Sequence, residues 1–157
     1  MKMNHLFTTK SNERNFSGAK KLLILLSAFA INAYATNDVA SQQLSVSSDN
    51  TYYTDGGEMV YARNVEINQG ALEIDGDNAV STRSVYTVVG SPATFEQSRS
   101  GNNIQGSANE ITYYKNSGRL SLVGDARIGV GNEQLASDII VYNVSTNAAT
   151  VVEVEED

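Results

Sequence analysis

Apolar and polar residues alternate along most of the chain from residue 36 onward. Residues 65–67, 72–74, 120–122 and 126–130 each place apolar side chains at every second position. Successive side chains of a β-strand point to opposite faces, so each segment has one apolar and one polar face. No stretch beyond residue 36 shows the 3.6-residue period of a helix. The pattern predicts an all-β fold of about fourteen to sixteen short antiparallel strands.

Short turn signals separate these segments. Gly, Asn and Asp tolerate the left-handed backbone conformations that tight hairpin turns require. The only proline, Pro92, has no N–H to donate to a ladder, so we expect it at a strand start or an edge, with Phe95 pointing inward. The predicted turns are Asp55-Gly56-Gly57, Gln69-Gly70, Asp75-Gly76-Asp77, Asn116-Ser117-Gly118 and Gly131-Asn132.

A five-residue motif recurs along the chain. Copies occupy residues 49–53, 77–81, 109–113 and 138–142, with starts 28, 32 and 29 positions apart, and all but the second end in tyrosine. Residues 59–67 also match residues 120–128 in their apolar positions, with Arg63 where the later copy has Gly124. Repeats of this length are typical of stacked supersecondary units that bury one continuous core. We therefore expect a single-domain, open β-jellyroll with internal repeats and an apolar trough between two sheets.

The first and last predicted strands, residues 44–46 and 148–154, would leave unpaired backbone groups at the ends of the stack. Such edges favour end-to-end pairing with another chain. The acidic residues 153–157 could instead block the last edge by charge repulsion. The sequence is compatible with both interpretations.

Residues 1–35 have the pattern of a cleaved signal peptide. Five basic residues precede an apolar run at residues 22–31, and Ala33-Tyr34-Ala35 fits a cleavage site between Ala35 and Thr36. The apolar run is too short to span a hydrocarbon core of about 30 Å. We therefore predict a signal peptide at 1–35, a β-domain at 36–152 and an acidic tail at 153–157.

Charge and composition exclude several classes of function. The chain beyond Ala35 holds 6 of the 11 Lys and Arg and 17 of the 18 Asp and Glu residues, for a net charge of −11. Such a chain has little to neutralise phosphates, so no nucleic-acid partner is expected. There is no Cys, and the only His is His5, which excludes disulfides, Cys- or His-based metal sites and triads with a His base.

No segment predicts catalysis or metal binding. Residues 75–78 (DGDN) resemble a calcium loop, but Ala79 stands at a ligand position and a solvated hairpin turn is favoured. The acids alternate with apolar residues, which places them on outer faces and not in a glycosidase-like cleft. We expect no enzyme, cofactor or metal.

Three tyrosines are expected in the core, namely Tyr61, Tyr113 and Tyr142. Four arginines are scattered along the sequence and are exposed candidates for contact with a phosphorylated head group, namely Arg83, Arg99, Arg119 and Arg127.

Three segments carry a resemblance to the LptA/OstA family of periplasmic lipopolysaccharide-transport bridge proteins. Residues 90–95 (GSPATF) are similar to the family's G-x-P-A-T-F signature. Residues 104–113 running into 118–126 resemble its internal repeat, and residues 135–143 resemble its closing segment. The likeness covers about residues 44–150.

The resemblance implies a β-jellyroll, open at both ends, that holds the acyl chains of lipid A and carries lipopolysaccharide across the periplasm from the inner to the outer membrane. It implies end-to-end self-association and partners with similar jellyrolls in the inner- and outer-membrane transport components. An alternative interpretation is a structural or adhesive secreted β-repeat protein that assembles through its sheet edges and has a filled, lipid-free core. The lipid-binding residues implied by the resemblance are Leu44, Val46, Met59, Tyr61, Val65, Ile67, Leu72, Ile74, Phe95, Ile104, Ile111, Tyr113, Leu120, Leu122 and Ile128.

Overall fold

The computed structural model describes residues 39–98, 101 and 103–153. The predicted signal peptide with its Ala35–Thr36 cleavage site, Arg99, and residues 154–157 of the predicted acidic tail lie outside the described residues. The elements are a short 3-10 helix, η1 (Val39–Ser41), and the strands β1 (Leu44–Ser47), β2 (Asn50–Tyr53), β3 (Met59–Gln69), β4 (Leu72–Thr82), β5 (Val85–Gln97), β6 (Ile104–Tyr114), β7 (Arg119–Val130), β8 (Glu133–Asn143) and β9 (Ala148–Val151).

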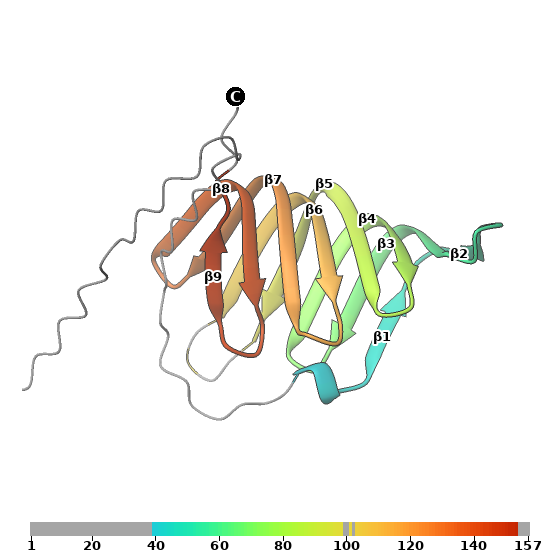
Figure 1. Ribbon diagram of the computed structural model, residues 1–157, viewed down its shortest axis with the longest axis horizontal. Coiled ribbons are helices and arrows are strands. Elements are labelled where there is room, and N and C mark those ends of the chain that lie inside the picture. The colour runs from blue at the N-terminus through green and yellow to red at the C-terminus, as the bar shows by residue number, and fades with distance from the viewer. Residues whose placement is uncertain (1–38, 99–100, 102, 154–157) are drawn as a thin grey trace, which may run out of the picture.

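The strands form one antiparallel sheet in the order β1-β3-β4-β5-β6-β7-β8-β9. Both β1 and β2 pair with β3, β1 along residues 66–69 and β2 along residues 59–62. Figure 1 shows the strands side by side from β1 and β2 at one end of the stack to β9 at the other. The predicted all-β fold, open at both ends, is confirmed.

The described residues contain nine strands and not the predicted fourteen to sixteen. Each long strand, β3 to β8, comprises two of the predicted short segments. The chain bends at mid-strand but does not turn back, and it goes on to pair with the same neighbouring strands beyond the bend. The ladder is interrupted between Ala62 and Val65 in β3 and between Val123 and Ala126 in β7, and it resumes beyond each bend. Bulges of this kind bend a strand without ending it.

Residues with positive φ make the bends in β3 and β7. Arg63 and Asn64 have φ values of 63° and 51°, and Gly124 and Asp125 have 79° and 49°. Arg63 and Gly124 therefore occupy equivalent positions, as the alignment of the two repeats predicts. The Arg63 backbone N–H donates to Asn78 Oδ1 on β4 at 3.3 Å. The side chain of Asn78, which belongs to the second copy of the motif, thus provides an acceptor for a backbone N–H at the bend, where the ladder is interrupted.

The hairpin turn predicted at Asp75-Gly76-Asp77 is wrong. These residues lie within β4, where the ladder with β5 is interrupted between Asp75 and Asn78. A Cβ at position 76 would lie 2.9 Å from the carbonyl oxygen of Val89, so the glycine allows close approach of the neighbouring strand. Glycine inside a strand pattern marks either a turn or a bulge, and the tertiary fold decides between them. Pro92 lies in the corresponding interruption of β5, between Val89 and Ala93, and not at the strand start or edge expected from the sequence, because a bulge also leaves the ladder N–H unneeded.

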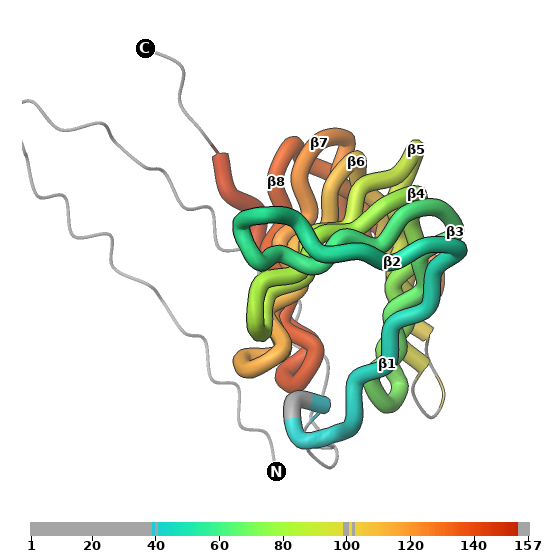
Figure 2. The backbone as a smooth tube through the Cα atoms, turned by 90° about the vertical axis from the view of Figure 1, so that its right-hand side faces the viewer, coloured from blue at the N-terminus to red at the C-terminus, as the bar shows by residue number. Residues whose placement is uncertain are grey.

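The bends fold the sheet into two facing layers around a common interior, and Figure 2 views this arrangement along the stack. The turns β3–β4, β4–β5, β6–β7 and β8–β9 lie at the bottom of Figure 1, on the side opposite the bends, which we call the open side. The front layer, named from Figure 1, contains β2, β9 and residues 59–62, 78–82, 85–89, 110–114, 119–123 and 139–143. The rear layer contains β1 and residues 65–69, 72–75, 93–97, 104–107, 126–130 and 133–137.

The four copies of the sequence motif occupy equivalent places in the front layer. Each begins beside a bend and follows an even-numbered strand toward the open side. Met59 pairs with both Tyr53 and Ser81, and Leu120 pairs with both Tyr113 and Tyr142, so the last residues of all four copies lie in one row. The repeat is therefore one hairpin of the stack, as the spacing of the copies predicts.

Candidate functional site

The interior between the layers is lined by four rows of side chains that follow the cross-strand register. In the front layer, the row beside the open side (the front rim row) contains Met59, Ser81, Tyr86, Tyr113, Leu120, Tyr142 and Ala149. The front inner row contains Tyr61, Ala79, Val88, Ile111, Leu122, Ile140 and Val151. The rear inner row contains Val46, Ile67, Ile74, Phe95, Gly106, Ile128 and Leu135, and the rear rim row contains Leu44, Gln69, Leu72, Gln97, Ile104, Val130 and Glu133.

All fifteen residues that the resemblance implies as lipid-binding are buried or half-buried, and fourteen of them, all except Val65, lie in these rows. Eleven are core residues, and Leu44, Val46 and Tyr61 pack against that core while half-buried. Met59 is half-buried at the front rim. The expected inward orientation of Phe95 is confirmed, because the side chain is 2% exposed. Their contact with lipid stays a prediction.

Sequence reasoning missed part of the interior. Ile140 aligns with Ile111 in the repeat, so the motif itself could have identified it, whereas Tyr113 and Tyr142 are buried as the sequence predicts. The small residues had no comparable signal, because an alanine in an alternating segment does not show which face is buried. The other missed core residues are Val39, Ala79, Val88, Ala93, Ala108, Ala126, Val144 and Ala149.

Two tyrosine–glutamine pairs join the layers across the open side. The hydroxyl of Tyr113 donates to Gln69 Oε1 at 2.6 Å, and the hydroxyl of Tyr142 donates to Gln97 Oε1 at 2.6 Å. All four side chains are at most 1% exposed. The Tyr142 ring also stacks on Phe95 with the ring centroids 5.4 Å apart. Buried polar groups need partners, and each pair supplies one for the other inside an apolar interior.

Segments from both ends of the described chain complete the closure. The amide of Gln69 donates to the Gln42 carbonyl at 2.8 Å, just after η1. The amide of Gln97 donates to the Val144 carbonyl at 3.0 Å, in the turn between β8 and β9. In the described residues no buried side-chain nitrogen or oxygen lacks a hydrogen-bond partner. The hydrogen-bonded side chains of Gln69, Tyr113, Gln97 and Tyr142 therefore bridge the two layers along the open side, and we call them the polar seam.

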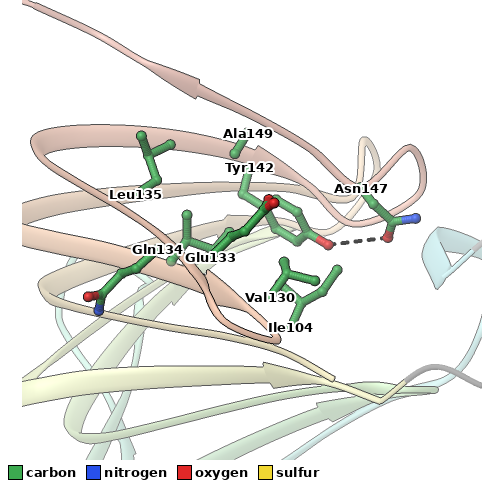
Figure 3. Close-up of a pocket in the computed structure, with 9 residues that line it drawn as sticks. Ile104, Val130, Glu133, Gln134, Leu135, Tyr142, Asn147 and Ala149 are labelled. Carbon is green, nitrogen blue, oxygen red and sulfur yellow. Dashed lines mark hydrogen bonds between the residues drawn. The ribbon is translucent and has the colours of Figure 1, made fainter. Parts of the chain in front are cut away.

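An apolar cavity of about 60 Å³ lies at the β8–β9 end of the interior (Figure 3). Ile104, Val130 and Leu135 contribute apolar walls, and the exposed Glu133 and Gln134 stand at its entrance. Figure 3 shows the Tyr142 hydroxyl directed toward Asn147, with which it forms a 3.2 Å hydrogen bond. The cavity exists because β9 pairs only with residues 140–143 and leaves the rear half of β8 uncovered.

The outer surface of the rear layer is acidic. Glu66 lies opposite Asp75, and Glu73 lies opposite Glu96, so like charges face each other across neighbouring strands. The charge of Asp75 raises the pKa of Glu73, with smaller effects of burial and of the other two acids. Partial burial, and then the charge of Glu66, raises the pKa of Asp75. Like charges placed directly opposite each other on a sheet are destabilising.

Three cations gather instead at the front edge of the open side. Arg83 lies in the β4–β5 turn, Lys115 lies in the β6–β7 turn, and Arg119 begins β7. The two turns are joined by a 2.9 Å hydrogen bond from the Lys115 backbone N–H to the Ser84 carbonyl. We call Arg83, Lys115 and Arg119 the basic rim. The arginines appear scattered in the sequence, but the fold brings Arg83 and Arg119 to adjacent turns, while Arg127 stays on the outer rear face.

Within the described part of the chain, no group of three or more His, Asp or Glu side chains is placed to hold a metal ion. Among residues 39–98, 101 and 103–153, no helix has the length and apolar character needed to cross a membrane. The fold and interior define a β-jellyroll, open at the ends of its stack, with a continuous apolar interior and a polar seam.

The chain belongs to the family described as LptA/(LptD N-terminal domain) LPS transport protein, whose model matches residues 45–148. The protein is thus an LptA/OstA-family lipopolysaccharide-transport protein. The lipopolysaccharide export system protein LptA of Escherichia coli strain K12 is 29% identical over 147 residues, which span 88% of this chain and 77% of the relative. LptA of Shigella flexneri matches to the same extent.

The fold is also that of a solved relative. LptH from Pseudomonas aeruginosa, described as the LptA homologous periplasmic component of the conserved lipopolysaccharide transport device, superimposes with a TM-score of 0.65. The sequence identity is 22%, and the match covers 75% of this chain and 85% of LptH. This likeness confirms the jellyroll expected from the sequence.

Proposed function

We propose that this protein binds the lipid A acyl chains of lipopolysaccharide between its two layers and carries the lipid across the periplasm, from the inner to the outer membrane, as one part of a protein bridge. The observation that supports this most directly is the apolar interior, whose inner rows run without a charged residue from β1 and β3 to β8 and β9. Family membership supports the role in lipopolysaccharide transport.

The proposal agrees with the chemistry of the chain. Leaving each acyl CH₂ group in water costs about 0.8 kcal/mol, so a multi-chain lipid needs a continuous apolar shield to cross an aqueous compartment. Shielding requires neither a nucleophile nor a general base, and we propose no enzymatic activity. The sequence contains no P-loop, so the energy for directed movement comes from other components.

The phosphate-bearing head group of the lipid fits best at the basic rim. Arg83 and Arg119 are exposed there, next to the open side through which acyl chains would reach the interior. The acidic rear face would repel phosphates. Head groups are therefore expected on the front edge, with the acyl chains pointing between the layers.

The ends of the stack favour assembly with similar jellyrolls. At one end, β2 carries the exposed Tyr52 and Tyr53, and at the other the rear half of β8 has no further strand beside it in the described residues. Unpaired strand edges are templates for β-augmentation. We propose end-to-end self-association and binding to the jellyrolls of inner- and outer-membrane transport components, in the periplasm to which the predicted signal peptide would direct the chain.

Native mass spectrometry of the purified protein, with and without lipopolysaccharide, tests the proposal. Leu135→Asp places a charge in the half-buried wall of the cavity and should abolish the lipid adduct. The matched control is Val123→Asp, because Val123 is also apolar and within a strand but lies 38% exposed on the outer face. These sites are preferable to Phe95, where a buried charge would unfold the protein.

A saturable adduct in the wild type and in Val123→Asp, but not in a folded Leu135→Asp, would support the lipid-carrier function. Oligomers without an adduct at any lipid concentration would favour the alternative, a structural β-repeat protein with a filled core. The same spectra give the intact mass of the exported protein, which shows whether cleavage occurs between Ala35 and Thr36.

A further inference from the structure

The two tyrosine–glutamine pairs repeat one geometry along the open side. Gln69 on β3 pairs with Tyr113 on β6, and Gln97 on β5 pairs with Tyr142 on β8, so each bond reaches three strands along the stack. In both pairs the tyrosine is in the front rim row and the glutamine in the rear rim row. The bonds therefore connect the layers at the point farthest from the bends, where separation of the layers would be greatest.

The interior behind this seam is filled by the protein's own side chains. The interior rows contain residues that are 0% exposed, namely Ile67, Ile74, Ile111, Leu120 and Leu122. The cavity beside β8 has a volume of only about 60 Å³. That volume accommodates a few methylene-sized groups and not a whole acyl chain. A lipid inside the jellyroll therefore requires the layers to move apart, and this movement cannot occur while both pairs are intact.

The seam is suited to reversible opening. Hydrogen bonds between neutral groups add only a small part to the stability of a closed state, because water replaces them when the groups are exposed. Acyl chains cannot replace them, so a tyrosine or glutamine left against lipid would be costly unless it moved to the wet edge. Both residue types stand at the rim, where a small displacement reaches water.

We propose that Gln69–Tyr113 and Gln97–Tyr142 form a latch that holds the empty jellyroll closed and sets the threshold for acyl-chain entry. This inference rests on the proposed lipid-carrier function. The closed state competes with lipid, so the apparent dissociation constant equals the intrinsic constant divided by the fraction of open molecules. Weakening the latch raises that fraction and tightens lipid binding, even though it destabilises the folded protein.

The test uses Tyr113→Phe, Tyr142→Phe and the double variant of the full chain, titrated with lipopolysaccharide. Each change removes one latch hydroxyl and keeps the ring, including the stacking of residue 142 on Phe95. Tyr86→Phe is the matched control, because Tyr86 is a front rim tyrosine outside both pairs. We expect each single latch variant to bind lipopolysaccharide roughly fivefold to tenfold more tightly, and the double variant more tightly still, through a larger association rate constant and with an unchanged dissociation rate constant.

Urea unfolding of the same variants separates a latch from a purely structural role. Lower stability with unchanged lipid affinity and association rate would overturn the latch while leaving the lipid-carrier function intact. A larger dissociation rate constant and weaker binding would also overturn it, by showing that the hydroxyls contact bound lipid. If wild type and Tyr86→Phe form no lipid complex at all, the proposed function fails and the latch fails with it.

Discussion

Gly106 is the position at which one added methyl group should disturb the interior most. It lies in the rear inner row between Phe95 on β5 and Ile128 on β7. A Cβ at this position would lie 2.9 Å from the Arg127 carbonyl oxygen and would overlap the Phe95 ring. The ring cannot shift freely, because it stacks on Tyr142, whose hydroxyl is bonded to Gln97. Gly106→Ala should therefore displace the Phe95 ring and, through it, Tyr142 and its hydrogen bond to Gln97.

The expected cost follows from packing. Carbon atoms attract each other best at about 3.5–4.0 Å, so the Cβ contacts at position 106 are strongly repulsive. Inserting a methyl group into a well-packed core typically costs about 1–3 kcal/mol. Replacing glycine also restricts the unfolded chain, which returns about 0.4–1 kcal/mol. We expect the upper part of the packing range to dominate, for a net loss of about 1–2 kcal/mol in the free energy of unfolding.

The assay is urea unfolding followed by far-ultraviolet circular dichroism, because the chain has no tryptophan to serve as a fluorescent probe. Gly129→Ala is the matched control on the adjacent strand. Its Cβ would meet only the Glu133 carbonyl oxygen, at an ordinary 3.5 Å, and Gly129 does not have a positive φ. Gly129→Ala should be neutral or slightly stabilising, whereas Gly106→Ala should lower the urea concentration at the unfolding midpoint in proportion to the expected loss of about 1–2 kcal/mol in the free energy of unfolding.

Equal stability changes in the two variants would refute this reasoning, because the only intended difference is the overlap with Phe95 and the neighbouring backbone. A second measurement identifies the ring as the cause. In the Phe95→Leu background the added methyl group has more space, so Gly106→Ala should cost less than it does in the wild type. Additive costs in that double-mutant cycle would show that the strain arises elsewhere.

Two further predictions concern charge. Burial and Glu66 raise the pKa of Asp75 above its ordinary 3.8, so the folded state holds this proton more tightly than the unfolded state and loses stability as pH rises through the raised pKa. Asp75→Asn should therefore be a few tenths of a kcal/mol more stable than wild type at pH 7, with the difference vanishing below pH 3.8 in paired urea titrations. Neutralising Arg83, Lys115 and Arg119 together with glutamine should weaken lipopolysaccharide binding and reduce its dependence on salt, whereas Arg127→Gln should change neither in a calorimetric titration at two ionic strengths.

Much of the fold could be predicted because each inward residue contributes to an alternating pattern. The strict alternation at residues 65–67 and 72–74 assigns their buried faces correctly, and the repeat places Tyr113 and Tyr142 in one row. Alternation is a property of the local backbone, so it is visible without knowledge of the tertiary fold. The same is true of the hairpin turn at Gln69-Gly70, where Gly70 has a φ of 61°.

The bends could not be predicted, because their residues also form turns. Asp75-Gly76-Asp77 has the composition of a hairpin turn but lies inside β4. At Gly76 the deciding factor is the approach of the Val89 carbonyl from β5, a contact between residues thirteen positions apart in the sequence. Local propensity contains no information on that contact. Reading these residues as a turn therefore divides β4 in two.

The seam was also beyond sequence reasoning, for a different physical reason. Gln69 and Gln97 stand where alternation calls for apolar residues, so in sequence each one reads as a defect in the pattern or the end of a strand. Each is 44 or 45 residues from its tyrosine. A buried glutamine is tolerated only with its partners in place, so its presence in the rim row is explained only by the facing layer.

The placement of these polar side chains bears directly on how one interior can be both a stable core and a lipid site. An interior of leucine and isoleucine alone would gain stability from closing and would oppose lipid entry along its whole length. Here the inner rows remain apolar, while the rim that must separate carries tyrosine and glutamine, whose mutual bonds water can replace. Opening at the rim therefore breaks bonds that water can replace, and the acyl chains that enter restore the apolar burial of the inner rows and of rim residues such as Leu72 and Ile104. Tyrosine suits the last position of the motif because its ring packs in the core while its hydroxyl reaches the hydrogen-bonding groups at the rim.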